Sequence, residues 1–498
     1  MPRLPLTDEQ KAAVCSASKR LFIEAAPGSG KTTVASERFG VLRFRPVTTV
    51  DGSMAAVSFT RSATGELRRR IRSRWGSTSL AWPHGVTTID TLVCNVVHHL
   101  LRQHVIHWPG DHETLEVLDD WRGHRGYRWL EAGSHRRVVT VSRLAMITSL
   151  GRRLREPQMG FGSVKDFHDH LGGGRCTHEE VRHVVTSALR QPALREAITR
   201  FLSDSVGHII VDEVFDANEL DLNLVLLACD AGISVTLIGD PWQALYGFRG
   251  ATPELVPRLV EGWGFESAPL SQSFRFKTPS TQDLSLRLRA GNPVSIRPGD
   301  SYDVVLASRW DGLWDGPDRV LPLSFGRSSN KMSAAMILLL DHVVQARFNR
   351  RAIFLAEALA LLNLDDATYR SLGPEALGEV ERLLVGSGAD GPEKALQALR
   401  PVMRLLGAPR QPRASTGDSE ARQIGLMRLL AARLRSLDPL VPGMTIHQAK
   451  GCEWDRVGVR LTPAECARLA SGLSRDYEGD RGLYVALTRA CQEVSLVS

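Results

Sequence analysis

Short apolar runs that end in polar residues recur along the chain and predict the buried strands of an α/β fold. The predicted strands lie at residues 21–23, 55–59, 86–92, 208–211, 235–240, 321–325 and 457–461. Segments with a helical period stand between them, for example 93–102 and 330–342. Strands that alternate with helices favour parallel sheets whose two faces are covered by helices.

Two long segments, 94–204 and 346–437, carry helical patterns and are expected to be mostly helical insertions. The second is broken by Gly, Pro and Ser near 386–388 and 407–417. Within the first, residues 121–155 hold nine Arg and a single acidic residue, with Trp and Tyr interleaved. That stretch is either a nucleic-acid contact or a solvated face over packed aromatics, and the sequence leaves both alternatives open.

The clearest candidate for chemistry is a glycine-rich loop between the predicted strand 21–23 and a helix-compatible segment. Strand, glycine-rich loop and helix, in this order, are the context of a phosphate-binding loop. Gly28 and Gly30 allow backbone N–H groups to point at a phosphate. Lys31 can reach the phosphate oxygens and the Thr32 hydroxyl can ligate Mg²⁺. The residues expected to hold the nucleotide are Ala26, Pro27, Gly28, Ser29, Gly30, Lys31, Thr32 and Thr33.

This loop predicts ATP and Mg²⁺ as ligands, although Ala25 stands where the common phosphate-loop pattern has its first glycine. A pair of carboxylates, Asp212 and Glu213, follows the apolar run 208–211. Ligands of open α/β sheets bind at the carboxyl ends of the strands. We therefore expect Asp212 to hold the metal and Glu213 to orient the attacking water.

Further candidates for the nucleotide site are polar or cationic residues at other strand ends and near the loop. Gln10, about one helix upstream of the loop, has an amide that can pair with both edges of adenine. Gln243, after the run 235–240, is a candidate to contact the γ-phosphate. Arg275 and Arg489 are candidate trans-acting cations, and Phe274 is a candidate contact to the base.

Nucleic-acid contacts are predicted where strands end in aromatic or hydroxyl residues beside basic segments. Phe59 and Thr60 end one strand and open a helix that contains Arg68, Arg69 and Arg70. After the run 235–240, two aromatic side chains are candidates to stack on bases and one cation is a candidate to bind a phosphate; these are Tyr246, Phe248 and Arg249.

Bulk properties agree with a polyanion-binding protein of the cytoplasm. The net charge is +7, which suits a nucleic-acid partner but also suits many other proteins. The seven cysteines contain no C-x-x-C pair, so free thiols in a reducing compartment are expected. Cys176, His178 and His183 suggest a metal site only weakly, because no second ligand pair is near in sequence. No apolar run is long enough to span a membrane.

Taken in order, these segments resemble the UvrD/Rep/PcrA family of superfamily 1A DNA helicases. The resemblance begins at Gln10 and the glycine-rich loop and continues through seven further stretches. These are AVSFTRSATGELRRRI, VTTIDTL, HIIVDEVFDAN, LIGDPWQALYGFRGA, LSQSFR, MTIHQAKGCEW and DRGLYVALTRA. The stretches cover about a fifth of the chain, and the longer ones are highly specific to the family.

The resemblance implies two RecA-like parallel-sheet domains with helical insertions, with ATP at the domain interface. It implies 3′-to-5′ translocation on single-stranded or 3′-tailed DNA. The first domain would comprise 1–93 and 205–270, with 94–204 as its insertion. The second would comprise 271–345 and 438–498, with 346–437 as a reduced 2B-like insertion.

By motif position, the resemblance also implies roles for single residues. Glu453 would contact the ribose, and Arg275 and Arg489 would act as arginine fingers. Residues expected to face DNA by this resemblance are Phe59, Thr88, Tyr246, Phe248, Thr445 and His447.

The chain departs from the family pattern at several positions. Phe215, Ala217, Asp90 and Asp480 stand where the family usually has Gln, Thr, His and Arg, respectively. These departures leave the coupling of hydrolysis to DNA movement open. The interval between Arg275 and Thr445 is also short for the family, which indicates a machine controlled by a partner.

Two pathways therefore stay open: anti-phage defence, as for the helicase subunit of Gabija systems, and DNA repair or recombination. The alternative activity is that of an ATP-gated DNA-end sensor, which recruits a partner nuclease without processive unwinding. A third reading, an inactive scaffold, conflicts with the complete set of nucleotide-site residues.

Overall fold

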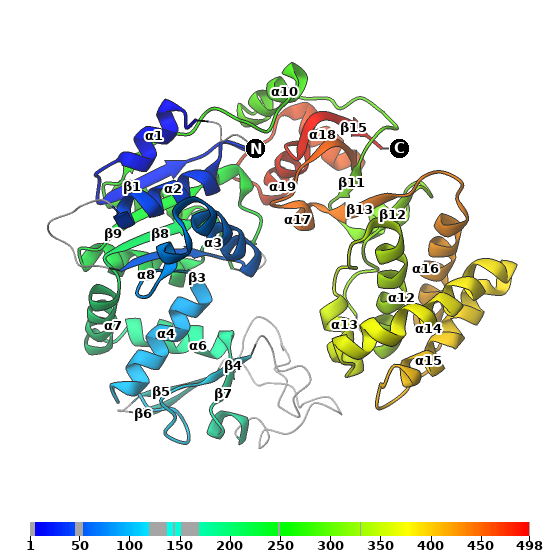
Figure 1. Cartoon of the computed structure of the whole chain (residues 1–498), viewed down its shortest axis with the longest axis horizontal. Helices are drawn as coiled ribbons and strands as arrows, with labels where there is room; N and C mark the ends of the chain where they lie inside the picture. Colours follow the sequence, from blue (N-terminus) through cyan, green and yellow to red (C-terminus); the bar gives the residue numbers. More distant parts are fainter. Residues whose placement is uncertain are drawn as a thin grey trace. The chain divides into compact units, whose positions relative to one another are not determined.

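The computed structural model describes residues 5–44, 53–118, 137–142, 145–150, 169–247, 250–328 and 330–497. The chain divides into two compact units, Met1–Phe274 and Arg275–Ser498. Both are built on parallel sheets with helices, which confirms the predicted α/β class (Figure 1). No helix in the described ranges is long and apolar enough to cross a membrane.

The first unit contains a six-stranded parallel sheet in the order β10-β1-β9-β8-β2-β3. Its strands are β1 (Arg20–Glu24), β2 (Met54–Ser58), β3 (Gly85–Thr88), β8 (His208–Asp212), β9 (Ser234–Gly239) and β10 (Glu266–Ser267). The helices around the sheet are α1 (Asp8–Cys15), α2 (Lys31–Phe44), α3 (Arg61–Trp75), α4 (Ile89–Arg102), α8 (Glu219–Asp230) and α9 (Leu255–Gly262), with the 3₁₀ turns η1 (Ser77–Leu80), η2 (Val214–Asp216) and η3 (Pro241–Gln243).

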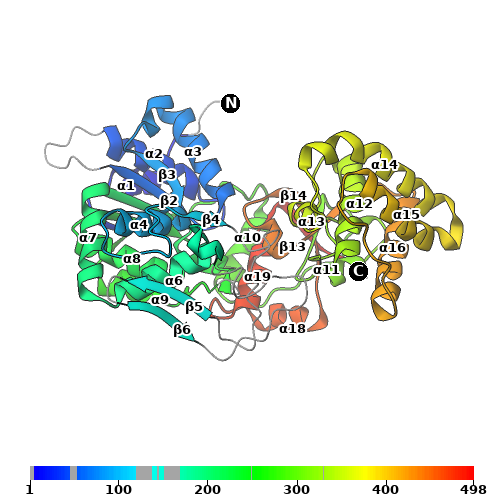
Figure 2. The same cartoon turned by 90° about the horizontal axis from the view of Figure 1, so that it is seen from below.

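Alternate residues of the strands face two separate cores, as the period of two requires. Leu21 and Ile23 face the core that α1, α2 and α3 cover, whereas Phe22 between them faces the opposite core. The second core is covered by α4, α8 and α9 together with the helices of the insertion. Figure 2 shows α2 and α3 above β2 and β3, and α8 and α9 below them. Burial on both faces explains why these strands read as continuous apolar runs.

The strands of the first unit begin and end close to their predicted positions, with one informative difference. The sequence predicts a strand through residue 92, but β3 ends at Thr88 and α4 begins at Ile89. The hydroxyl of Thr88 accepts the backbone N–H of Thr91 and thereby caps the helix. The capping hydrogen bond therefore starts the helix inside an apolar run that by itself favours a strand.

The described part of the segment between α4 and β8 contains short strands as well as helices, and its character as a mostly helical insertion stays a prediction. Its described elements are β4 (Glu116–Leu118), β5 (Arg137–Ser142), β6 (Ala145–Leu150), β7 (Arg175–Thr177), α6 (His178–Leu189) and α7 (Pro192–Ser205). β5 and β6 pair antiparallel, and β4 pairs with β7. The β-branched residues of RVVTVS favour a strand, and pairing with β6 satisfies its backbone. Most of the Arg-rich stretch 121–155 lies outside the described residues.

The second unit contains a five-stranded parallel sheet in the order β12-β13-β11-β14-β15. Its strands are β11 (Val304–Ala307), β12 (Val320–Pro322), β13 (Val441–Thr445), β14 (Trp454–Arg460) and β15 (Ala490–Leu496). The helices near this sheet are α10 (Pro279–Arg289), α11 (Trp310–Trp314), α17 (Ile446–Ala449), α18 (Pro463–Ser471) and α19 (Glu478–Leu487).

Residues 346–437 are helical, as their pattern predicts. The helices are α12 (Lys331–Phe348), which begins before this segment, α13 (Leu355–Leu362), α14 (Asp366–Gly386), α15 (Gly391–Leu405) and α16 (Asp418–Arg435), with the 3₁₀ turn η5 (Gly388–Asp390). α12 packs against α13, α14 and α15, and α15 packs against α16 (Figure 2). The chain divides into two compact units, which do not separate the two insertions from the domains that carry them. The boundaries of the four predicted domains therefore stay predictions.

Candidate nucleotide-binding site

The glycine-rich loop joins the carboxyl end of β1 to the amino end of α2. Gly28 and Gly30 have φ angles of +73° and +84°, a region in which glycine is favoured. Lys31 is the first residue of α2, and no acidic residue lies in the first turn of this helix. Free N–H groups and the helix dipole therefore make this end attractive to an anion.

The buried Ser29 hydroxyl lies in the same loop. In the described part of the chain its Oγ has no hydrogen-bond partner. A buried hydroxyl normally needs a hydrogen-bond partner, and a phosphate oxygen can accept a hydrogen bond from it. This observation and the helix end point independently to an anion.

Ala25, which replaces the first glycine of the common pattern, still belongs to the sheet. Its N–H donates to Gly239 O at 3.0 Å, and it pairs with Leu270 in an isolated parallel bridge. Ala25 is buried. A methyl group is therefore accommodated here, and the positive φ values begin only at Gly28.

Helix α1 is attached to the loop through Gln10. The Gln10 Nε2 atom donates to Ser29 O at 2.8 Å, and its Oε1 accepts the N–H of Thr7 at 3.1 Å. A Cβ atom added at Gly30 would lie 2.8 Å from Gln10 Nε2, so the side chain fits only against a glycine. The structure thus gives Gln10 a role in positioning the loop, and its contact with adenine stays a prediction.

The segment 271–274 holds the other side of the loop. Ser273 Oγ donates to Pro27 O at 2.7 Å, and Phe274 N donates to Gly28 O at 2.9 Å. The ring of Phe274 is 42% exposed although its backbone is attached to the loop. An aromatic ring exposed beside a phosphate loop is suited to stack on a base.

A further hydrogen-bonded pair, Glu9 and Ser271, joins α1 to the segment 271–274. Glu9 of α1 accepts from the backbone N–H of Ser271 at 2.8 Å and from its hydroxyl at 2.6 Å. These two hydrogen bonds lower the pKa of Glu9. Sequence reasoning missed this pair, because nothing in the local pattern relates residue 9 to residue 271.

The loop meets the predicted carboxylates. Lys31 Nζ lies 3.6 Å from Glu213 Oε1. β1 and β8 are separated in the sheet by β9 alone, so residues at their carboxyl ends are brought to one place. Asp212, the last residue of β8, is buried, and its Oδ1 accepts the N–H of Glu213 at 3.1 Å.

Glu213 has a backbone conformation that non-glycine residues rarely adopt. Its φ and ψ angles are +60° and +43°. A left-handed residue at the end of a strand turns the chain sharply, here into η2. This turn allows Asp212 and Glu213 to lie side by side at the sheet edge rather than on opposite faces of a continuing strand.

Gln243 lies next in this row of strand ends, after β9. Its Nε2 atom donates to Asp240 Oδ2 at 2.6 Å, while Asp240 Oδ1 accepts the N–H of Trp242 at 3.1 Å. Both Asp240 and Gln243 are buried. The buried carboxylate of Asp240 therefore fixes the orientation of Gln243, and this role of Asp240 was not predicted.

The donor set fits Mg²⁺. Thr32 and Asp212, the predicted ligands, offer a hydroxyl and a carboxylate, which are the hard oxygen atoms that Mg²⁺ prefers. In the described ranges no group of three or more His, Cys, Asp or Glu residues could hold a metal ion.

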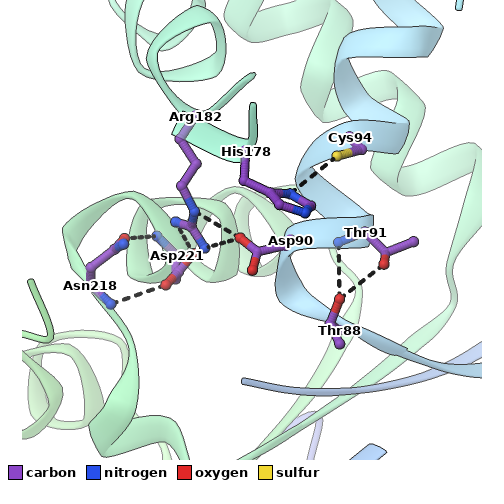
Figure 3. A network of polar contacts seen from close by, with 8 residues as sticks. All are labelled: Thr88, Asp90, Thr91, Cys94, His178, Arg182, Asn218 and Asp221. Atoms are coloured by element: carbon purple, nitrogen blue, oxygen red, sulfur yellow. Dashed lines mark hydrogen bonds and ion pairs between the residues drawn. The ribbon is translucent and has the colours of Figure 1, made fainter. Parts of the chain in front are cut away.

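Among the described residues, Cys176, His178 and His183 do not form a group that could hold a metal ion. His178 Nδ1 lies 3.9 Å from the Sγ of buried Cys94 (Figure 3). Burial raises the pKa of Cys94 to about 11, so its thiol stays protonated. All seven cysteines are free, as predicted.

In the second unit, the predicted finger residues form a cluster at the amino edge of the sheet, where β14 and β15 begin. Arg275 Nε donates to Glu453 Oε2 at 3.0 Å, and Arg275 Nη1 donates to Thr488 O at 2.8 Å. Arg489 is buried, and its Nε donates to Val485 O at 3.1 Å. The structure thus brings Arg275, Glu453 and Arg489 together, although 213 positions separate Arg275 from Thr488.

The predicted DNA contacts of the first unit lie at the ends of β2 and β3, at the carboxyl edge of the same sheet. Phe59 follows β2 and packs partly into the second core. Thr60 accepts from Ala63 N at 3.1 Å and caps α3, as Thr88 caps α4. Tyr246 follows η3 and is half-buried. Phe248 and Arg249 lie outside the described residues.

In the second unit, Thr445 ends β13 and His447 lies in α17. Both residues therefore stand at the carboxyl edge of the second sheet, whereas Arg275, Glu453 and Arg489 stand at its amino edge. The few residues between β13 and β14 thus connect two edges with different predicted roles. The contacts of Thr445 and His447 with DNA stay predictions.

The departures at Phe215 and Asp480 have structural explanations. Phe215 is buried, packs edge-to-face on Phe22 with ring centroids 6.2 Å apart, and lies over Gly239, where a Cβ atom would come within 2.7 Å of its ring. Asp480 is buried and accepts Arg468 Nε at 2.5 Å and Ser474 N at 2.8 Å. The Phe215 ring packs in the core and the Asp480 carboxylate accepts two hydrogen bonds, so the local structure accommodates both departures.

A polar network, missed by sequence reasoning, surrounds the third departure. Arg182 of α6 contacts both Asp90 of α4 and Asp221 of α8 (Figure 3). No motif marks Arg182 in the sequence, since a single Arg within a helical pattern usually lies on a solvated face.

The loop, the paired carboxylates and the parallel sheet define a fold of the P-loop class. Residues 6–123 and 175–261 match the model of the UvrD/REP helicase N-terminal domain. The first unit of this chain is therefore similar to the N-terminal domain of UvrD/REP helicases. The compact Gabija-like form stays a hypothesis.

Curated relatives agree with this family at low identity. DNA helicase II of Haemophilus influenzae is 25% identical over 298 residues, which cover 54% of this chain and 38% of that protein. DNA helicase IV of Escherichia coli is 24% identical over 366 residues, covering 62% and 52%, respectively. ATP-dependent DNA helicase PcrA of Staphylococcus epidermidis is 23% identical over 319 residues, covering 58% and 40%. The chain thus spans about two fifths to one half of these relatives.

Proposed function

We propose that this chain is a DNA-dependent ATPase that translocates on single-stranded DNA and unwinds 3′-tailed duplexes in the 3′-to-5′ direction. The observation that carries this proposal is the contact of Lys31 with Glu213, 3.6 Å apart, at the end of a glycine-rich loop. The names of the relatives, which are DNA helicases, supply the substrate.

Each residue of the first unit has a proposed task. The loop 26–33 binds the phosphates, with Lys31 beside the oxygens that gain charge during transfer. Glu213 orients the attacking water and accepts its proton. Mg²⁺, when bound by Thr32 and Asp212, would neutralise charge on the phosphate oxygens. Phe274 stacks on the base, and Gln10 adds a contact to adenine.

The cations proposed for the reaction belong to the second unit. We propose that Arg275 and Arg489 stabilise the charge that develops on the γ-phosphate and that Glu453 contacts the ribose. The support is the shared cluster of these residues at the amino edge of one sheet, together with their motif positions. The position of Thr445 and His447 at the opposite, carboxyl edge of this sheet supports them as contacts to the translocating strand.

Phe215 and Asp480 favour the second candidate, an ATP-gated sensor of DNA ends that activates a partner nuclease. Each of these side chains is satisfied within its own unit, where the family usually has a polar or cationic residue. A role in anti-phage defence and a role in repair are both compatible with either activity.

The first test measures phosphate release with and without single-stranded DNA at low salt, and unwinding of 3′-tailed and 5′-tailed duplexes. DNA-stimulated hydrolysis together with unwinding of the 3′-tailed duplex alone would support the translocase. Stimulated hydrolysis without unwinding would support the sensor. Hydrolysis that ignores DNA would contradict both.

The Lys31→Ala variant is the matched negative control for the site. It should lose hydrolysis by at least about 100-fold and keep the fold, because it removes one transition-state contact and leaves the backbone of the loop unchanged. Lys19→Ala, which removes an exposed lysine of the same unit, should behave as wild type. Persistence of ATPase activity in Lys31→Ala would overturn the assignment of the site.

A further inference from the structure

Arg182 holds two carboxylates from different helices at once. Its Nε donates to Asp90 Oδ1 at 2.8 Å, and its Nη1 donates to Asp221 Oδ1 at 2.9 Å (Figure 3). The Arg182 side chain is 23% exposed, Asp90 34% and Asp221 3%. Arg182 itself belongs to α6, in the insertion between α4 and β8.

The Asp90 side of this contact leads to a predicted DNA contact. Asp90 lies in the first turn of α4, two residues after Thr88. Thr88 ends β3, and its hydroxyl caps the helix by accepting Thr91 N at 3.2 Å and lies 2.9 Å from Thr91 Oγ1. A contact that fixes the first turn of α4 therefore also fixes the position of Thr88.

The Asp221 side leads to the catalytic carboxylates. Asp221 lies in the first turn of α8, where Asn218 and Asp221 form a reciprocal capping box with both hydrogen bonds at 3.1 Å. Only η2 and Ala217 lie between Glu213 and Asn218. The amino end of α8 thus fixes the chain that leaves Asp212 and Glu213.

We propose that Arg182 is a positioning residue that couples DNA bound at Thr88 to the hydrolytic site at Asp212 and Glu213. It acts by holding the first turns of α4 and α8 in one arrangement. This inference rests on the proposed function and extends it to a residue of the insertion. All its parts lie in the first unit, so it needs no contribution from the second.

Neutralisation of a buried carboxylate does not by itself explain the arrangement. Asp221 needs a cation because it is almost fully buried, and a single contact to Arg182 would satisfy it. Asp90 is one-third exposed and could be solvated without any partner. The planar guanidinium of Arg182 also directs two further N–H groups to Asp90 and thereby links two helices. A compact ammonium group, such as that of Lys, is less suited to contact both carboxylates at once.

The substitution that isolates the coupling is Asp90→Ala. It cuts the link to α4 and leaves the Arg182–Asp221 pair in place. Basal hydrolysis should stay within about 2-fold of wild type, whereas hydrolysis at saturating single-stranded DNA should fall by about 5-fold, an effect typical of residues that carry coupling between sites. A role in stability alone would lower both rates together.

Three matched variants sharpen the test. Arg182→Lys keeps the charge but not the fork, and it should lower the stimulated rate as Asp90→Ala does. The double variant of both changes should be no worse than either one, because each cuts the same link. Glu196→Ala removes one partner of the exposed Glu196–Arg200 pair in α7 of the same insertion and should change neither rate.

Amide hydrogen exchange gives a readout that does not depend on DNA. In Asp90→Ala, peptides that cover residues 85–94 should exchange faster, whereas peptides in α7 should not change. Unchanged exchange at 85–94, or an unchanged stimulated rate in a chain that DNA stimulates, would overturn the inference alone. A wild-type ATPase that ignores DNA would overturn the proposed function and the coupling role together.

Discussion

The Nζ atom of Lys31 lies 3.6 Å from the Oε1 atom of Glu213, although the two residues are separated by most of the first unit in sequence. One follows β1 and the other follows β8. Their meeting places a cation, a carboxylate and the N–H groups of a helix end at one edge of a parallel sheet. The chemistry proposed above depends on this contact more than on any other.

Glu213→Gln should separate binding from hydrolysis. The amide keeps the size of the side chain but cannot accept a proton from water, so the rate of phosphate release should fall by at least about 100-fold. Nucleotide affinity should stay within a few-fold of wild type, as measured with a fluorescent ATP analogue. Glu219→Gln, which changes an exposed residue of α8, is the matched control and should leave both quantities unchanged. A near-normal rate in Glu213→Gln would contradict the role of Glu213 as base.

Gly30→Ala should damage the loop in two ways. The φ angle of +84° strains a side-chain-bearing residue, and the new Cβ would lie 2.8 Å from Gln10 Nε2. We expect a loss of about 1–3 kcal/mol in the free energy of unfolding and a weaker affinity for nucleotide. Urea denaturation measures the first and equilibrium binding the second.

Gly65→Ala is the matched control for Gly30→Ala. Gly65 lies within α3, and a Cβ atom added there would meet nothing within 4 Å. The same chemical change should therefore stabilise the protein by about 0.5–1 kcal/mol, because alanine is the better helix former. Equal effects of the two substitutions would show that the loop conformation of Gly30 is unimportant.

Phe274→Ala should weaken nucleotide binding and spare the chemical step. The ring is 42% exposed, so its loss costs little folding energy, whereas a stacked base contributes about 1–3 kcal/mol to binding. We expect KM for ATP to rise by about 10-fold with kcat within about 2-fold of wild type. Trp82→Ala removes another exposed aromatic ring and should change neither value. An unchanged KM in Phe274→Ala would place the base elsewhere.

Arg182→Met should make stability depend on pH. Burial raises the pKa of Asp221, and Arg182 opposes that rise. Without Arg182 the folded-state pKa rises further, so the protonated form contributes stability that is lost as pH increases through this raised pKa. At pH 7 we expect a deficit of about 2–3 kcal/mol, somewhat below the cost of breaking a fully buried pair because Arg182 is partly exposed.

The deficit of Arg182→Met relative to wild type should therefore shrink as pH is lowered from 7 toward 5. Denaturant unfolding of both proteins at the two values measures it. The sign follows from the carboxyl group, since protonation removes the buried charge that methionine leaves unpaired. A deficit that grows on acidification would show that Asp221 stays ionised in the variant.

Much of the fold follows from local properties of the sequence. Apolar runs such as 208–211 predict strands because burial on both faces leaves no polar position in them. The glycine-rich loop is recognisable because positive φ angles restrict Gly28 and Gly30 to one residue type. Thr7 and Gln10 likewise form a capping box, which their spacing of three residues in the sequence predicts.

Other features were decided by contacts between distant residues. The insertion carries β5 and β6 because each strand satisfies the backbone of the other, and a helical pattern in one segment carries no information about a partner. Phe215 became a core residue only because Gly239 leaves room for its ring. Neither outcome can be read from a window of neighbouring residues.

The candidate site shows the same division. Lys31, Asp212 and Glu213 were predicted by residue type and by position at a strand end, and the sequence alone determined that the chain carries a nucleotide loop and a pair of carboxylates. The tertiary structure decided that Lys31 contacts Glu213, that Gln10 forms a hydrogen bond to the loop and that Arg182 links α4 to α8. The physical reason is that strand order sets which ends become neighbours, and this order is a property of the packed sheet rather than of any single segment.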